Sequence, residues 1–436
     1  MKATTPSLSN SNEPIALAAL IGLDWADKQH ALTLSEAGST QLERTTLTHT
    51  PEAIGVWVGA LRQRFGGRPV GIGLEQSRGA LFHALSGYDH VVLYPIPTQM
   101  LKKLREAFSG SGAKDDPSDA DLAWEVLAKH REHLRAWKPD AVEARLLDRL
   151  CEARRDLVGQ RTKLVQKLGA WLKQYFPQAL DWAGDDLSSR MACDFLLKWP
   201  TLESIQRARS QTVRAFYYGH HSRRMDRVQA RIEAMPKAVA LTTDAAVIEC
   251  ESRRVQAVAR QLRALAVDIE SFDQRIAEVF ATHPDRAIFK SLPGAGAQLE
   301  PRLASALGTD RKRYEAAEAM QTYSGVAPVL ERSGKSQWVH WRWACPKFVR
   351  QTWVEFAGCS RFESRWAATY YQVQIERGKG HQAALRALAY KWVRIVWRCW
   401  QDGTAYSEER YEAALRRRGS PLAARLSQVA TVQTAN

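Results

Sequence analysis

Paired cysteines are absent from this 436-residue sequence, although it contains six cysteines. They occur one at a time, at Cys151, Cys193, Cys250, Cys345, Cys359 and Cys399. Because structural zinc sites use closely spaced pairs such as C-x-x-C, this pattern argues against a structural zinc site. Scattered single cysteines are typical of a chain whose thiols stay reduced in the cytosol. We therefore expect a cytoplasmic protein.

The sequence also lacks an N-terminal apolar run long enough to cross a membrane. The stretch IALAALIGL at 15–23 falls well short of the roughly 20 residues that a spanning helix needs. Glu13 and Pro14 precede it at the place where a signal peptide carries positive charge. The stretch therefore predicts a buried strand, and we expect no membrane partner.

Acidic residues are scarce relative to basic ones. The chain has 47 Asp and Glu against 62 Lys and Arg, which gives a formal net charge of +15. Lysines and arginines gain affinity for polyanions by releasing counterions from phosphates, so this excess favours a nucleic-acid partner. A basic proteome is the alternative explanation.

The length of the chain exceeds that of one ordinary core, so we expect two or three domains. Residues 1–14 are polar and are predicted to be disordered. Residues 15–138 alternate strand and helix patterns, which is typical of an α/β domain. The expected strands are 15–25, 30–36, 42–49, 69–77 and 90–97, and the expected helices are 51–65, 78–85, 97–108 and one after Pro117.

Strand patterns nearly vanish in residues 139–285, which are predicted to be helical. Four apolar residues recur every seven positions, at Leu150, Leu157, Leu164 and Trp171. A longer seam with spacings of three and four contains Val255, Val258, Leu262, Leu265, Ile269, Phe272, Ile276 and Val279. Such a seam favours a coiled coil, within the chain or between chains, and an amphipathic helix on a local core is the alternative.

Residues 286–412 are predicted to form a third, mainly α-helical domain, followed by a disordered tail at 413–436. Near its end, tryptophans alternate with basic residues. The apolar side chains there fall at helical spacing, at Leu385, Leu388, Trp392, Ile395 and Val396, so the tryptophans are expected in a core. The neighbouring basic residues remain candidates for a face toward phosphates: Arg386, Lys391, Arg394 and Arg398.

Four acidic residues of the α/β domain form a pattern that favours a metal site. Asp24 and Glu75 end two expected strands, at the sheet edge where functional groups gather. Asp116 and Asp119 lie three residues apart, so a helix places both on one face. Converging carboxylates repel one another unless cations neutralise them, and oxygen ligands suit Mg²⁺ or Mn²⁺. Two such ions about 4 Å apart can clamp the oxygens of a phosphodiester.

The stretch KDDPSDAD at 114–121 also has a simpler interpretation, as a helix start. Asp116 is a suitable N-cap, Pro117 suits the first turn, and Asp119 fits the acidic position of a capping box. The two interpretations are compatible, because the cap would aim both aspartates at the strand ends. Asp115 precedes the cap and Asp121 points off the shared face, so we leave both out of the site.

The order of these acids resembles the ribonuclease-H-like fold in its RuvC-type variant. Further motifs follow in the third domain, PGAGAQ at 293–298 and YEAAEAMQTYSGVAPVLERSGKS at 314–336. With the form K-x-D-x-x-D-A at 114–120, they resemble the DEDD-type insertion-sequence transposases, the family numbered one-ten, described as bridge-RNA-guided serine recombinases. The resemblance spans roughly residues 17–400.

The resemblance implies roles for individual residues. The N-terminal carboxylates of the family bind the divalent metal, which here are Asp24, Glu75, Asp116 and Asp119. A serine, here Ser333, attacks the DNA phosphate and forms a covalent phosphoserine. The implied partners are donor and target DNA, a structured guide RNA, and further copies of the chain in a dimer or tetramer. In that family the metal domain and the serine domain of one active site come from different subunits.

Several alternatives stay open. Ser324 and Ser336 are rival nucleophiles, and Ser324 stands where the family has a small residue. A Ser-Gly dipeptide is also typical of a solvated turn. A hydrolytic RuvC-type junction-resolving nuclease would use water in place of serine, and a non-catalytic nucleic-acid-binding protein would use neither. The stretch QWVHWRWACP at 337–346 is richer in tryptophan than the family pattern, so its contacts do not follow from the resemblance.

Overall fold

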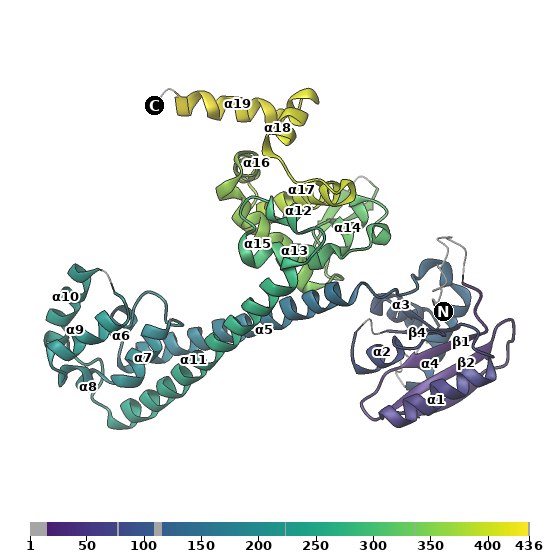
Figure 1. The fold of residues 1–436 in the computed structure, drawn as a ribbon, viewed down its shortest axis with the longest axis horizontal. Helices are drawn as coiled ribbons and strands as arrows, with labels where there is room; N and C mark the ends of the chain where they lie inside the picture. Colours follow the sequence, from purple (N-terminus) through teal and green to yellow (C-terminus); the bar gives the residue numbers. More distant parts are fainter. Residues whose placement is uncertain (1–14, 76–77, 109–115, 223, 335, 435–436) are drawn as a thin grey trace, which may run out of the picture. The chain divides into compact units, whose positions relative to one another are not determined.

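The structure is a computed structural model that describes residues 15–75, 78–108, 116–222, 224–334 and 336–434. The chain divides into two compact units, residues 1–139 and 140–436 (Figure 1). The expected disordered segment 1–14 lies outside the described residues. Among the described helices, none combines the length and apolar character that a membrane crossing requires.

The first unit contains a five-stranded sheet whose order is β3-β2-β1-β4-β5. Its strands are β1 (Ala19–Asp24), β2 (Gln29–Glu36), β3 (Glu43–Thr48), β4 (Val70–Leu74) and β5 (Val91–Pro95). Strands β1, β2 and β3 form an antiparallel meander, and β4 and β5 run parallel to β1. This arrangement confirms the mixed α/β character predicted for the N-terminal region.

Helices cover both faces of this sheet. They are α1 (Pro51–Arg64), α2 (Ala80–Leu85), α3 (Thr98–Phe108) and α4 (Asp116–Lys129). Ile21 and Ile72 lie in the core that α1 and α2 share with the sheet. The other face carries α4, which packs with α3 around Ala123 and Val126. Successive residues of the buried strands therefore point alternately toward the layer of α1 and α2 and toward the layer of α3 and α4.

Two glycines on the α4 face let the helix backbone lie directly on the strands. A Cβ at Gly22 of β1 would stand 2.0 Å from the carbonyl oxygen of Ala120 and 2.2 Å from the amide nitrogen of Trp124. A Cβ at Gly73 of β4 would stand 3.1 Å from the carbonyl oxygen of Ala123. Because these neighbours are backbone atoms, the helix would have to move to admit any side chain at Gly22.

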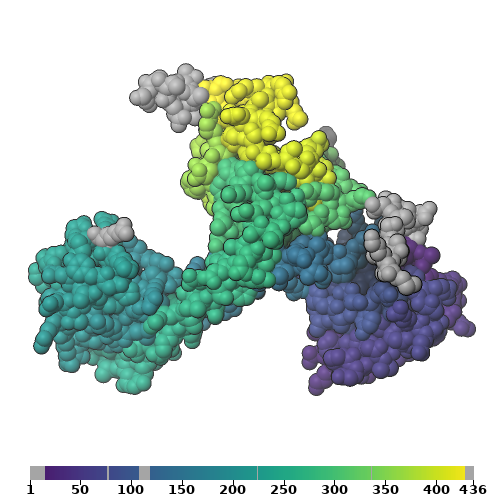
Figure 2. All heavy atoms as spheres, viewed as in Figure 1, coloured from purple at the N-terminus to yellow at the C-terminus, as the bar shows by residue number. Residues whose placement is uncertain are grey.

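Two long helices organise the second unit, α5 (Val142–Tyr175) and α11 (Ala245–Ala281). They lie side by side and antiparallel, since Leu147 of α5 shares a core with Ile276 of α11, whereas Leu168 shares another core with Val255 (Figure 1). In Figure 2 the atoms of α11 form a continuous diagonal band. Arg154 also forms an ion pair with Asp273 across the two helices.

A cluster of short helices packs near the end of this pair that contains Leu168. These are α6 (Ala179–Trp182), α7 (Arg190–Lys198), α8 (Leu202–Gln206), α9 (Ser210–Gly219) and α10 (Met225–Ala234). The seam residues Val255, Val258 and Leu262 are buried in that core, within the chain itself. A coiled coil with a second chain stays a prediction.

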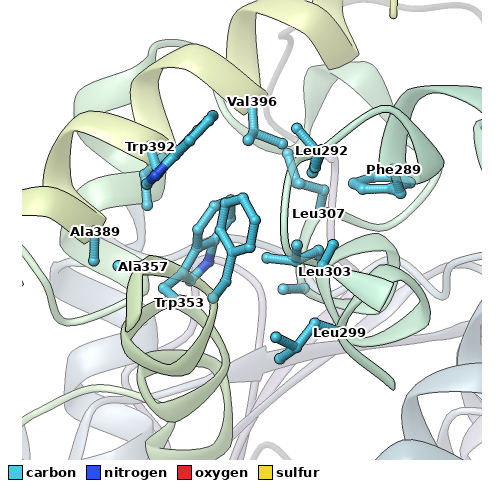
Figure 3. Packing of buried hydrophobic residues seen from close by; sticks show 14 of the residues in the cluster. Phe289, Leu292, Leu299, Leu303, Leu307, Trp353, Ala357, Ala389, Trp392 and Val396 are labelled. Atoms are coloured by element: carbon cyan, nitrogen blue, oxygen red, sulfur yellow. The ribbon is translucent and has the colours of Figure 1, made fainter. Parts of the chain in front are cut away.

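The third region is mainly helical and shares one large core (Figure 3). Its helices are α12 (Arg286–Lys290), α13 (Gly296–Leu307), α14 (Ala317–Tyr323), α15 (Lys347–Glu363), α16 (Arg365–Glu376) and α17 (His381–Asp402). Trp353 of α15 and Trp392 of α17 lie in this core with Leu303 of α13 (Figure 3). The expectation that Trp392 is a core residue is therefore confirmed.

The expected disordered tail at 413–436 is wrong for its described part. Helix α18 (Glu408–Arg417) continues past residue 413, and α19 (Pro421–Thr434) follows it. Leu422, Ala423 and Leu426 are buried in the same large core. Their spacing places them on one helix face, and the burial of that face outweighs the local break at Gly419.

We predict that Gly22→Ala strongly destabilises the first unit. The added Cβ meets helix backbone rather than flexible side chains, so we expect a loss of about 3 kcal/mol in the free energy of unfolding. Thermal unfolding of the full chain measures it. Gly59→Ala in α1 is the matched control, because a Cβ there meets nothing within 4 Å and should stabilise the helix slightly. Equal stability of the two variants would contradict the packing.

Candidate functional site

Two of the expected metal ligands lie at the carboxyl edge of the sheet. Asp24 is the last residue of β1, and Glu75 directly follows β4. The parallel register pairs Gly22 with Gly73 and Leu23 with Leu74, so the next position brings Asp24 beside Glu75. Both lie two residues beyond a glycine that faces α4, and therefore on the α4 side of the sheet.

Helix α4 brings a third acid to the same edge. A Cβ at Gly71 would contact Leu127, whereas one at Gly73, farther along β4, would also contact Ala123. The helix therefore runs against the strand direction, and its first turns lie toward the carboxyl edge. Asp119 belongs to these turns and is buried, with 6% of its surface exposed.

The fourth expected ligand is Asp116, the first residue of α4. The helix thus begins one residue before Pro117, at the residue that the cap interpretation places just ahead of the first turn. The side chain of Asp116 lies outside the described residues, as do Lys114 and Asp115. Its part in a metal site stays a prediction.

Arg105 of α3 neutralises Asp119. One carboxylate oxygen, Oδ1, accepts hydrogen bonds from Arg105 Nε at 3.0 Å and from Nη2 at 2.5 Å. The two side chains are 20% and 7% exposed. A carboxylate this deeply buried needs a cation or several donors, because burial removes its hydration. Arg105 could not be predicted as the partner of Asp119, since it lies 14 residues away on another helix.

The chemistry of the acids fits a hard divalent cation. Carboxylate oxygens are the ligands that Mg²⁺ prefers, and the positive charge that Asp119 requires comes from a side chain that a metal could replace. In the described part of the chain, no group of three or more His, Cys, Asp or Glu is arranged to hold a metal ion. Binding at this edge would therefore require the acidic side chains to rearrange, and a metal would compete with Arg105 for Asp119 Oδ1.

Asp121 has a separate structural role. Its Oδ1 accepts a hydrogen bond from the Thr33 hydroxyl at 2.6 Å, and its Oδ2 lies 2.9 Å from Arg44 Nη2. The carboxylate therefore ties α4 to β2 and β3. Its exclusion from the candidate site is consistent with these contacts.

Two histidines, which sequence reasoning missed, lie at the turn after β1. The amide of Ala26 donates to His30 Nδ1, and His30 Nε2 lies 2.9 Å from His49 Nδ1. Burial, together with the nearby His49, lowers the pKa of His30 and so favours its neutral imidazole. The pair holds the turn that follows Asp24.

The expected nucleophile lies at the tip of a two-stranded hairpin, β6 (Val329–Ser333) and β7 (Ser336–His340). Ser333 pairs with Ser336, and Gly334 has a positive φ of 57° that suits the tight turn. Both serines are exposed. Ser324 is instead fully buried and donates a hydrogen bond to the Gln321 carbonyl, so it is inaccessible to DNA.

The base of this hairpin is anchored on the helical core. A Cβ at Gly325 would stand 2.2 Å from the sulfur of Cys345, so the two ends of the segment meet closely there. The ring of Trp341 lies under two guanidinium groups, Arg350 at 4.6 Å and Arg386 at 4.0 Å. The hairpin that carries Ser333 at its tip is therefore fixed to the helical core at its base.

Comparison with known proteins identifies two domains in the chain. Residues 21–177 match the DEDD-type transposase domain of IS110, and residues 286–372 match the transposase family IS116/IS110/IS902. The mini-circle putative transposase for IS117 from Streptomyces coelicolor is 24% identical over 92% of this chain and 98% of its own length. An uncharacterized 42 kDa protein of insertion element IS900 from Mycobacterium paratuberculosis is 27% identical over 77% of this chain and 83% of its own.

We predict that Arg105→Gln makes the first unit depend on a divalent cation. In EDTA the variant should melt at a lower temperature than the unaltered protein, because buried Asp119 has lost its guanidinium partner. Mn²⁺ should restore that temperature and bind about tenfold more tightly than to the unaltered protein, because a charge-assisted contact no longer competes. Calorimetric titration and thermal unfolding of the full chain measure both effects.

Arg44→Gln is the matched control for this experiment. It removes the guanidinium that pairs with Asp121 on the same helix, away from the expected site. Its response to Mn²⁺ should equal that of the unaltered protein. An equal Mn²⁺ response of both variants would exclude Asp119 as a metal ligand.

Proposed function

Since the chain belongs to the IS116/IS110/IS902 family of transposases, we propose that it cuts and rejoins the DNA of an insertion element through a metal site and Ser333. The metal ligands in this proposal are Asp24, Glu75, Asp116 and Asp119. The observation that supports it most is the position of Asp24, Glu75 and Asp119 at one edge of the sheet, inside the segment that matches the DEDD-type domain.

The acids would hold Mg²⁺ or Mn²⁺ against the phosphate that reacts. A bound divalent ion would stabilise the negative charge that builds on the phosphate oxygens in the transition state. The strand ends position Asp24 and Glu75, and the glycine contacts position Asp119. Arg105 supplies the compensating charge until the metal and the DNA arrive.

Ser333 would attack the scissile phosphate as the nucleophile. A phosphorus–oxygen bond forms to the serine oxygen while the bond from phosphorus to one deoxyribose oxygen breaks, and the proton of the serine hydroxyl ends on that departing oxygen. The number of phosphoester bonds is the same before and after this step. The reverse attack by a deoxyribose hydroxyl therefore rejoins DNA without ATP. Exposure at a hairpin tip suits this role, because the hydroxyl must reach a phosphate on a large substrate.

Guide RNA and self-assembly complete the proposal. Both come from the resemblance to bridge-RNA-guided recombinases, and the net charge of +15 is consistent with binding two nucleic acids. The helical part between 140 and 285 is the segment we assign to RNA binding and to pairing with a second chain. A dimer or tetramer would let a metal domain and a serine domain of different copies act on one phosphate.

We predict that Ser333→Ala abolishes the covalent protein–DNA adduct and lowers strand exchange by at least about a thousandfold, as expected for loss of a nucleophile. Denaturing electrophoresis of the full chain with labelled element ends detects the adduct. Ser336→Ala is the matched control on the same hairpin face and should keep it. If the adduct persisted in Ser333→Ala, Ser333 would not be the nucleophile. Cleavage without an adduct in the unaltered protein would favour the hydrolytic nuclease.

A further inference from the structure

Two tryptophans at the serine hairpin face solvent. Trp338 on β7 is 51% exposed, and Trp343 shortly after the strand is 77% exposed. Trp353 and Trp392 of the same region are instead fully buried. Both faces of the two-stranded hairpin are exposed, and such a ribbon is only marginally stable in water by itself. The exposed indoles therefore indicate a surface that binds a partner.

Trp338 lies on the same face of the hairpin as Ser333. Ser333 pairs with Ser336, and the next pair on that face is Glu331 with Trp338. Two residues along a strand span about 7 Å. That distance corresponds to about one nucleotide of an extended strand, so a base next to a phosphate at Ser333 would reach the indole.

Positive charge gathers at the base of the hairpin, whereas on the face of Trp338 the cross-strand neighbour Glu331 pairs with His340. Three arginines at the hairpin base form no ion pair with a carboxylate of the described residues: Arg342, Arg350 and Arg386. Arg332 also forms none, but it lies on the opposite face of the hairpin from Trp338. Arg302 and Arg311 of the same unit, in contrast, pair with Glu355 and Asp285. Burial and the neighbouring charge of Arg350 lower the pKa of Arg386, as expected where guanidinium groups gather without acids. This charge is complementary to phosphates.

We propose that Trp338 and Trp343, with these arginines, form a stacking platform for unpaired bases of the DNA strand that reacts at Ser333. The identity of that strand rests on the proposed function. Aromatic side chains stack on bases whose faces are open, and the bases of a duplex cover one another. Strand exchange must open the duplex, so unpaired bases next to the scissile phosphate are available. The arginines would hold the backbone of the same strand.

The test uses the full chain and a fluorescein-labelled single strand of about 12 thymidines, followed by fluorescence anisotropy at constant salt. Trp338→Ala and Trp343→Ala should each weaken binding at least about fivefold, the lower range for the loss of one stacked base. Trp338→Phe keeps an aromatic face and should bind within about twofold of the unaltered protein. Each variant should have the melting temperature of the unaltered protein, which shows that the substitution has not unfolded the chain.

Phe362→Ala is the matched control. Phe362 is a ring on α15 that is 75% exposed and lies 4.5 Å from the guanidinium of Arg361, outside the hairpin. Its loss should leave the affinity unchanged. The tryptophan variants should keep the slope of log affinity against log salt. Arg342→Gln, next to Trp343, should reduce that slope by about one phosphate contact.

Three results would overturn the platform. These are unaltered affinity of both tryptophan variants, an equal loss for a duplex of the same length, and a loss confined to a single-stranded RNA. The outcome is independent of the nucleophile, because Ser333→Ala should bind the thymidine strand normally. If the adduct persisted in Ser333→Ala while Trp338→Ala still lost affinity, the serine assignment would fail and the platform would stand.

Discussion

The contact of α4 with β1 and β4 is the constraint on which the first unit depends. Gly22 and Gly73 lie side by side in the register, and both admit helix backbone where any other residue would place a Cβ. This contact fixes the height of the helix over the sheet and its direction along the strands. The ends of β1 and β4 and the first turns of α4 then meet at one edge. Asp24 and Glu75 lie on the α4 side of this edge because each follows one of the two glycines by two residues.

The charge of Asp119 links the carboxyl edge of the sheet to the proposed metal site. Asp119 is buried, so it needs a positive partner whether or not substrate is present, and Arg105 supplies one. A divalent ion at Asp119 Oδ1 would take the place of this guanidinium. At the serine hairpin, in contrast, Arg342, Arg350 and Arg386 have no acidic partner among the described residues, and Trp338 and Trp343 are exposed.

Much of the fold could be predicted from the sequence, because apolar runs and helical spacings of neighbouring residues determine its strands and helices. The apolar runs predicted β1 and β4, so Asp24 and Glu75 could be placed at strand ends, and the helical spacing around Trp392 predicted a core. The pairing of Arg105 with Asp119 had no such signal, since it depends on how two helices cross. The burial of Leu422 was missed for the same reason. Exposure of Trp338 also could not be predicted, because alternation along a strand does not reveal whether either face is covered.

The most direct test of this account is anomalous diffraction from crystals of the full chain grown with Mn²⁺. We expect a manganese peak at the carboxyl edge of β1 and β4, with oxygens of Asp24, Glu75 and Asp119 as ligands. The guanidinium of Arg105 should have left the Asp119 carboxylate. A structure that keeps the Arg105–Asp119 ion pair while manganese binds elsewhere would contradict the account.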